Sequence, residues 1–140
     1  MKIAIINGPN LNLLGKRQPE VYGNVDFESF LTELNEKFSD TEISYYQSND
    51  EGDLINQIQN CDGAYQGIVL NPGGYTHTSV AIADAVSSIK CPVIEVHISN
   101  IYQREAQRHQ SLLSKYCKGS IVGLGLIGYQ FAVELLLEKD

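Results

Sequence analysis

Four short, almost uninterrupted apolar runs constrain this chain most, because they alternate with segments of helical periodicity. The runs are KIAII, GIVLN, PVIEVH and SIVGL, at residues 2–6, 67–71, 92–97 and 120–124. Apolar runs of this length are typical of strands that are covered on both faces. A fifth, weaker strand is predicted at residues 42–47, EISYYQ. We therefore expect a sheet that lies inside the molecule.

The segments between these runs have the spacing of amphipathic helices. Apolar residues keep one face over residues 27–38, after a possible N-cap at Asp26, and again over residues 54–58, 81–89 and 127–138. Strict alternation of strands and helices implies a parallel sheet with right-handed crossovers and helices on both faces. Five strands favour a flavodoxin-like α/β fold with strand order 2-1-3-4-5, in a single domain that spans residues 1–140.

Composition excludes several partners. The chain carries a net charge of −7 and only ten Lys and Arg residues, which argues against binding to nucleic acid or to an anionic membrane surface. No window approaches the roughly 18 apolar residues of a membrane span, and the first apolar run is too short for a signal peptide. We expect a cytoplasmic protein.

The three cysteines, Cys61, Cys91 and Cys117, are widely spaced and form no C-x-x-C pair. This pattern suggests neither a disulfide framework nor a zinc site. We expect three reduced, structural thiols.

The predicted strand order also places the functional site. Ligands of such folds bind outside the carboxyl ends of the strands, at the switch point between the first and third strands. Three connections meet at that edge: residues 7–23, 71–79 and 97–100. The first is too long for an ordinary connection. Together they bring the following polar residues to one cleft: Asn10, Arg17, Tyr22, Asn71, His77, His97 and Ser99.

Known chemistries of this fold can be tested on these positions. A phospho-accepting receiver domain needs acidic residues where Asn7 and Asn71 stand, and the segment GPNLNLLG lacks the G-x-G-x-x-G pattern of dinucleotide binding. No His/Asp/Glu spacing suggests a metal. A non-enzymatic flavin or nucleotide carrier stays open as an alternative, because residues 71–79, NPGGYTHTS, offer backbone amides to an anion.

Acid–base chemistry is the other possibility. Glu95 and His97 share one face if the strand continues that far, so the carboxylate can orient the imidazole and make it a general acid. Tyr22 is a poor base unless a cation such as Arg17 lowers its pKa. Structural interpretations stay open beside these. Tyr22 can simply pack its ring, His97 can be a hydrogen-bonded structural histidine, and Asn10 and Asn71 can be turn residues. Arg104 and Arg108 can belong to a solvated helix face.

Six segments in chain order closely resemble the type II 3-dehydroquinate dehydratases, also called type II dehydroquinases. The segments are NGPNLNLLGKRQPEVYG, QSNDEGDLI, NPGGYTHTSVAIADA, VIEVHISNIYQRE, RHQS and GLGLIGYQFA. The resemblance implies a flavodoxin-like fold and the dehydration of 3-dehydroquinate to 3-dehydroshikimate, with neither cofactor nor metal. The resemblance also implies that this reaction serves the shikimate pathway or quinate catabolism.

The resemblance also implies a role for each site residue. Tyr22 would be the base, Arg17 would support its phenolate on a mobile lid with Gly15 and Gly23 as hinges, and His97 would be the acid oriented by Glu95. The other roles concern substrate binding. The resemblance implies that Asn10 holds a water at the enolate oxygen. It also implies that Asn71, Ile98 and Ser99 bind the substrate carboxylate, and that His77 and Arg108 bind the ring hydroxyls. Asp84 would reach the site of a neighbouring subunit, in a homo-oligomer of trimers gathered into a dodecamer.

Overall fold

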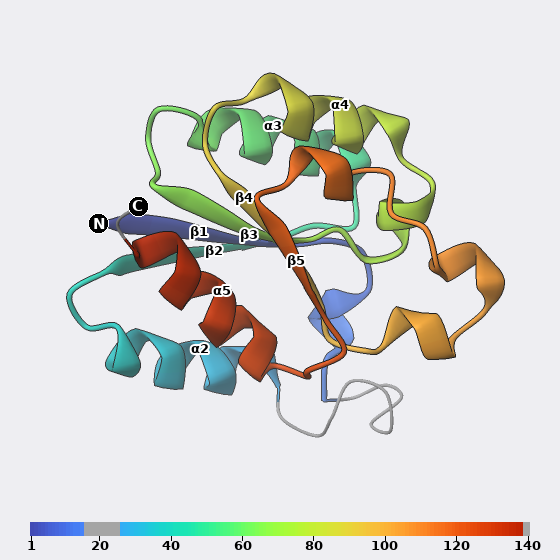
Figure 1. Ribbon diagram of the computed structural model, residues 1–140. Coiled ribbons are helices and arrows are strands. Elements are labelled where there is room, and N and C mark those ends of the chain that lie inside the picture. Colours follow the sequence, from blue (N-terminus) through green and yellow to red (C-terminus); the bar gives the residue numbers. More distant parts are fainter. Residues whose placement is uncertain (16–25, 139–140) are drawn as a thin grey trace.

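The fold is a five-stranded parallel sheet in the strand order β2-β1-β3-β4-β5. It comes from a computed structural model that describes residues 1–15 and 26–138 (Figure 1). The strands and α-helices are β1 (Lys2–Asn7), α2 (Phe27–Lys37), β2 (Glu42–Gln47), α3 (Glu51–Cys61), β3 (Gly67–Asn71), α4 (Val80–Ser88), β4 (Val93–His97), β5 (Gly119–Val122) and α5 (Ile127–Leu137). Short 3₁₀-helices lie in the connections: η1 (Leu11–Leu13), η2 (Gly73–His77), η3 (Ile101–Gln103), η4 (Ala106–Arg108) and η5 (Ser114–Tyr116). The predicted flavodoxin-like order is confirmed.

Helices cover both faces of the sheet. In Figure 1, α3 and α4 lie on one face and α2 and α5 on the other. Side chains alternate along each strand, so β1 sends Ile3 and Ile5 into the core under α2 and α5, and Ala4 and Ile6 into the core under α3 and α4. Burial on both faces explains why the central strands have uninterrupted apolar sequences.

The helix boundaries follow their local signals. The side chain of Asp26 accepts a hydrogen bond from the backbone N–H of Ser29 at 2.8 Å, which confirms the predicted N-cap of α2. The strand β5 ends at Val122, two residues before the predicted end, because Gly123 has a φ of 84° and the chain leaves the sheet there. The expected strand at residues 42–47 is confirmed as β2.

The three cysteines are free thiols. Burial raises the pKa of Cys61 and of Cys91 to about 11 and that of Cys117 to about 12. These thiols are protonated at neutral pH and are poor nucleophiles, as expected for structural cysteines.

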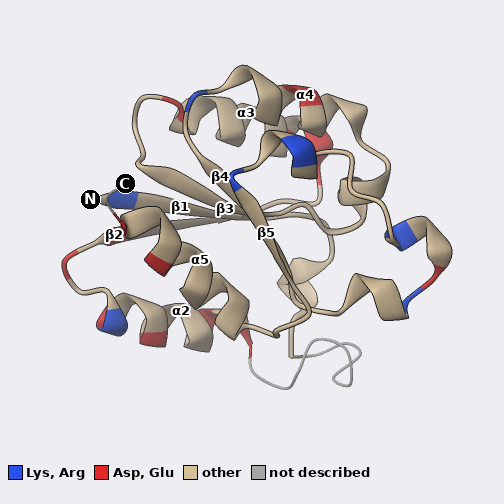
Figure 2. Cartoon of the chain, in the orientation of Figure 1, with Lys and Arg blue, Asp and Glu red and all other residues tan. Residues whose placement is uncertain are grey.

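Charged residues are spread over the helices and loops of the described chain, with no continuous basic strip among them (Figure 2). None of the helices in the described ranges is long and apolar enough to cross a membrane.

Candidate active site

A cleft of about 770 Å³, including its open mouth, lies at the carboxyl ends of the strands, where it was predicted. Its walls come from the connections after β1, β3 and β4. The lining residues are Pro9, Asn10, Leu11, Leu13, Leu14, Asn71, Gly73, Gly74, His77, His97, Ile98, Ser99, Ile101, Arg104 and Arg108. A polar cleft of this size suits a small ligand.

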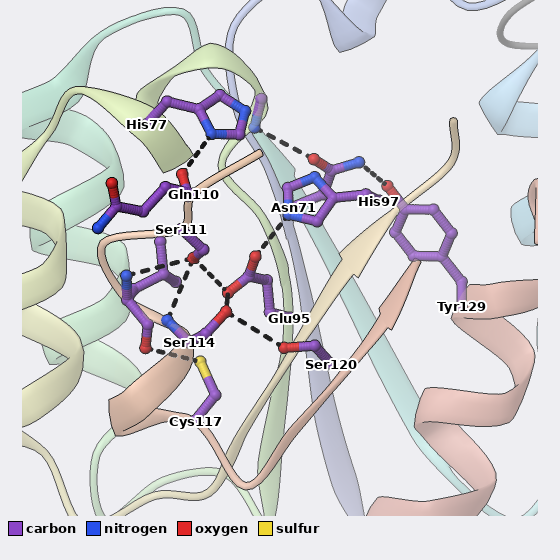
Figure 3. Close-up of polar contacts among 12 residues, drawn as sticks. Asn71, His77, Glu95, His97, Gln110, Ser111, Ser114, Cys117, Ser120 and Tyr129 are labelled. Atoms are coloured by element: carbon purple, nitrogen blue, oxygen red, sulfur yellow. Dashed lines mark hydrogen bonds and ion pairs between the residues drawn. The ribbon is translucent and has the colours of Figure 1, made fainter. Parts of the chain in front are cut away.

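Glu95 and His97 form a buried pair at the end of β4 (Figure 3). They share the face that carries α3 and α4, as the spacing predicted, and their exposed fractions are 1% and 5%. His97 Nε2 lies 2.5 Å from Glu95 Oε2. The second ring nitrogen, Nδ1, has no hydrogen-bond partner in the described part of the chain, so it is left for a ligand in the cleft.

Two serines hold the other oxygen of Glu95. The Oγ atoms of Ser111 and Ser114 each lie 2.9 Å from Glu95 Oε1. Ser111 Oγ also accepts hydrogen bonds from the backbone N–H groups of Leu113 and Ser114, at 3.3 and 3.1 Å. Because both acceptor positions of that hydroxyl are taken, its own hydrogen must point at Glu95.

These contacts set the charge of Glu95. Burial alone would raise the pKa of its carboxyl group, but the hydrogen bond and the charge of His97, and then the hydroxyls of Ser111 and Ser114, hold the pKa below its usual value. Glu95 is therefore ionised at neutral pH, and an ionised carboxylate can only accept from His97 Nε2.

His77 lies beside His97 on the wall formed by η2. The two rings stack with their centroids 6.3 Å apart. His77 Nδ1 is 2.7 Å from the carbonyl oxygen of Gln110, and because a carbonyl accepts, Nδ1 must carry a hydrogen. Its other ring nitrogen, Nε2, is therefore the one left to contact other groups.

Asn71 ends β3 on the opposite face of the sheet, which carries α2 and α5. Its Oδ1 accepts from the backbone N–H of Gly73 at 3.1 Å, and its Nδ2 donates to the phenol oxygen of Tyr129 at 2.9 Å (Figure 3). Asn71 is 3% exposed and lines the cleft. Asn71 therefore lies at the cleft, and its part in the site stays a prediction.

Asn10 sits at the start of η1 with a φ of 70°, the single positive φ outside glycine among the described residues. Asparagine tolerates this left-handed conformation. Its backbone N–H donates to Asn49 Oδ1 at 3.0 Å, and Gln47 Nε2 donates to Gly8 O at 3.1 Å. The last residue of β2 and the connection after it thus fix the wall that carries Asn10, a contribution that the sequence interpretation missed.

Two arginines line the cleft from the segment after β4. Arg108 Nε lies 3.0 and 2.9 Å from the two carboxylate oxygens of Glu105, and Arg104 Nη1 lies 3.5 Å from Ser99 Oγ. The alternative of a solvated face does not hold for these two residues, because Arg104 follows the 3₁₀ turn η3, Arg108 ends the 3₁₀ turn η4, and both line the cleft. The signal for Arg104 was its place in the motif VIEVHISNIYQRE.

Four predicted site residues are not among those that line this cleft in the described chain. Glu95 is one of them, and it is joined to the cleft through its hydrogen bond to His97. Tyr22 and Arg17 lie outside the described residues, as does the expected hinge Gly23. Asp84 is described, but it lies exposed on α4 and does not line the cleft of its own chain. Gly15, the other expected hinge, has a φ of 84°.

The residues present do not favour a metal or a flavin phosphate. No group of three or more His, Cys, Asp or Glu residues in the described ranges could hold a metal ion. At the N-terminus of α4, Ser79 caps the backbone N–H of Ile82 and also bonds the carboxylate of Glu51. An acidic group at this helix end opposes a bound phosphate.

Comparisons with known proteins agree on one family. The family model described as Dehydroquinase class II matches residues 1–137. The 3-dehydroquinate dehydratase of Bacillus subtilis is 51% identical over 139 residues, which cover 97% of this chain and 93% of that protein. The protein of the same name from Exiguobacterium is 50% identical and covers 99% of this chain and 95% of its own. The crystal structure of a type II dehydroquinase from Butyrivibrio crossotus superposes with a TM-score of 0.94 at 48% identity, covering 99% of this chain and 98% of that one.

Proposed function

The chain belongs to the class II dehydroquinases, the type II 3-dehydroquinate dehydratases, and we propose that it removes water from 3-dehydroquinate to give 3-dehydroshikimate. The observation that carries this proposal is the buried pair of Glu95 and His97 at the end of β4, where His97 lines the cleft. An imidazole held by an ionised carboxylate on one nitrogen and open to a ligand on the other is arranged as a general acid.

The reaction divides into two proton transfers. Tyr22, as a phenolate supported by Arg17, takes the proton from the carbon beside the ketone, and the electron pair moves into an enolate. The enolate then re-forms the ketone as the bond to the hydroxyl on the next carbon breaks, and His97 gives a proton to that hydroxyl, which leaves as water. With Nε2 committed to Glu95, the proton leaves His97 from Nδ1. Tyr22 afterwards releases its proton to solvent and His97 takes one up from solvent, which returns both groups to their starting states.

The rest of the cleft binds and polarises the substrate. Asn10, on the wall formed by η1, holds a water at the enolate oxygen, where a donor stabilises the developing charge. Asn71, Ile98 and Ser99 cradle the carboxylate, and His77 and Arg108 meet the ring hydroxyls. All six residues line one cleft, which supports these assignments.

We further propose that the protein acts as a homo-oligomer of trimers gathered into a dodecamer, in which Asp84 completes the site of a neighbouring subunit. The exposed position of Asp84, outside its own cleft, supports this role. The free thiols fit the reducing conditions of the cytoplasm. There the enzyme would serve the shikimate pathway or quinate catabolism.

A direct assay tests the activity. Purified protein should convert 3-dehydroquinate in excess chelator and without added cofactor, and the conjugated enone acid that forms should raise the ultraviolet absorbance. A folded His97→Ala variant is the control and should be slower by roughly 10²- to 10⁴-fold, the usual contribution of a positioned acid. A well-folded wild-type protein that gives no absorbance rise would refute the assignment.

A further inference from the structure

A buried tyrosine joins the two asparagines at the ends of the central strands. Asn7 of β1 and Asn71 of β3 are register partners, and both side chains lie on the face that carries α5. Tyr129 of α5 is fully buried, and its hydroxyl lies 2.9 Å from Asn71 Nδ2 and 2.8 Å from Asn7 Oδ1. Asn7 Nδ2 lies 3.3 Å from the hydroxyl of Tyr45 on β2. These contacts form a chain of hydrogen bonds that runs from the cleft into the core.

One backbone group fixes the direction of every bond in this chain. The N–H of Gly73 can only donate, so the Asn71 atom that faces it is Oδ1 and the atom that faces Tyr129 is Nδ2. The Tyr129 oxygen must accept from that amide, and its hydrogen then goes to Asn7 Oδ1. Burial raises the pKa of Tyr129 far above its usual value, which keeps the phenol hydrogen in place.

This direction leaves one hydrogen unused. Asn71 Nδ2 carries two hydrogens, of which one is donated to Tyr129. Because Asn71 lines the cleft, the other hydrogen is available to a ligand that accepts hydrogen bonds. A rotated Asn71 amide would present an oxygen there instead, which would repel an anionic ligand.

We propose that Tyr129 is a positioning residue, which holds the Asn71 amide so that its free hydrogen points at a substrate carboxylate. The inference deepens the proposed function and rests on it. Without the phenol oxygen, Nδ2 of Asn71 and Oδ1 of Asn7 both lose their partner inside the core. Unpaired buried polar groups are costly, so the two amides turn toward each other and the free hydrogen leaves its place.

Tyr129 also packs as an aromatic ring, and the test must separate that role. Its ring meets Phe27 edge to face with the centroids 5.0 Å apart. The variant Tyr129→Phe keeps this ring and removes only the hydroxyl. Tyr45→Phe is the matched control, because it removes a hydroxyl at the far end of the same chain and leaves the bonds of Asn71 intact.

The experiment measures binding of quinate, which has the carboxylate but no ketone and does not react, and it also measures kcat and KM with 3-dehydroquinate as the substrate. Tyr129→Phe should weaken quinate binding and raise KM by roughly 10- to 100-fold, the usual loss for a hydrogen bond to a charged group, and should change kcat much less. Tyr45→Phe should leave the quinate dissociation constant and KM within about twofold of the wild-type values. This should hold even if Tyr45→Phe lowers the melting temperature as much as Tyr129→Phe does.

A double variant tests whether the effect passes through Asn71. On an Asn71→Ala background, Tyr129→Phe should add less than about a twofold further loss of quinate binding. If Tyr129→Phe does not fold, Asn7→Ala replaces it, because removing the acceptor frees the phenol hydrogen to turn toward Asn71. Unchanged quinate binding in the single variant, additive losses, or equal losses in Tyr45→Phe would overturn the proposal. A wild-type protein without turnover would refute the proposed function, whereas quinate binding would still test Tyr129.

Discussion

Replacing Ser111 or Ser114 by alanine tests how a single hydrogen bond affects the pKa of the buried Glu95. Each substitution removes a hydroxyl that lowers the pKa of Glu95, so that pKa should rise. The acid-side fall of kcat should then move to higher pH, because Glu95 loses its charge sooner. Among the described residues, His97 and the Cys117 thiol are the titratable groups that face Glu95.

The control for this experiment is Ser120→Ala. Ser120 Oγ lies 3.4 Å from Ser114 Oγ and belongs to the same polar cluster, but it makes no hydrogen bond to Glu95. Its pH profile should match that of the wild type. Equal shifts in all three variants would show that the serines act through general packing and not through the carboxylate.

Proton exchange separates the two proposed catalytic groups. Tyr22→Phe removes the base, so exchange of the substrate's acidic hydrogen with solvent deuterium, followed by NMR, should stop. His97→Ala removes the acid of the later step, so exchange should continue in part while dehydration falls by roughly 10²- to 10⁴-fold. If Tyr22→Phe exchanged that hydrogen at the wild-type rate, another residue would have to be the base.

Single residues also show which contacts could be predicted from the sequence and which could not. The pairing of Glu95 with His97 was predictable, because two positions apart on a strand means the same face. The contribution of Ser111 and Tyr129 was not, because each acts through a hydrogen bond to a residue 16 or 58 positions away. Nothing in local spacing indicates such a partner.

At the scale of the elements, the connections after β1 and β3 are in close backbone contact. The chain after β1 passes so close to the chain after β3 that a Cβ atom on Gly8 would lie 2.4 Å from the carbonyl oxygen of Pro72. The N–H of Gly8 donates to Asn71 O at 2.7 Å across the same contact. Two backbones can approach this closely only without a side chain between them.

Gly8→Ala should therefore push the two walls of the cleft apart. We expect the free energy of unfolding to fall by about 1–3 kcal/mol, as for other overpacked sites, and KM to rise. Urea unfolding and steady-state kinetics measure the two effects. Gly119→Ala is the matched control, because a Cβ atom there meets no other atom within 4 Å. A Gly8→Ala protein as stable as the control would contradict the close contact.

The elements themselves were largely predictable. Uninterrupted apolar runs predicted the central strands because β1, β3 and β4 are buried on both faces, and helical spacing predicted α2 to α5 for the segments between them. The segment after β4 was not predictable in this way. It consists of 3₁₀ turns that are held by side chains such as Asn100, which caps η3, and such turns have no period to detect.

At the scale of the whole molecule, the folded chain exposes an apolar stripe along α5 and the turn before it. Leu124, Ile127, Phe131 and Leu135 are each more than a third exposed. A contiguous apolar patch is typical of a protein–protein interface. The patch supports the proposed homo-oligomer.

Asp84→Ala tests the proposed assembly through its activity. If Asp84 completes a neighbouring site, its removal should lower kcat/KM, and the wild-type activity should fall on dilution as the oligomer dissociates. Light scattering measures the mass in the same samples. Asp40→Ala, an exposed aspartate at the opposite end of the strands, should have no effect. A fully active monomer would rule out a shared site.

The sheet divides the candidate active site between two separately packed cores. Glu95 and His97 are supported from the side of α3 and α4, whereas Asn71 and Tyr129 are supported from the side of α2 and α5. Substitutions in one core should therefore affect one half of the proposed chemistry, proton donation or carboxylate binding, and largely spare the other. Their effects on kcat/KM should be additive across the sheet and epistatic within a core. Such an arrangement lets a lineage adjust substrate affinity and proton transfer independently.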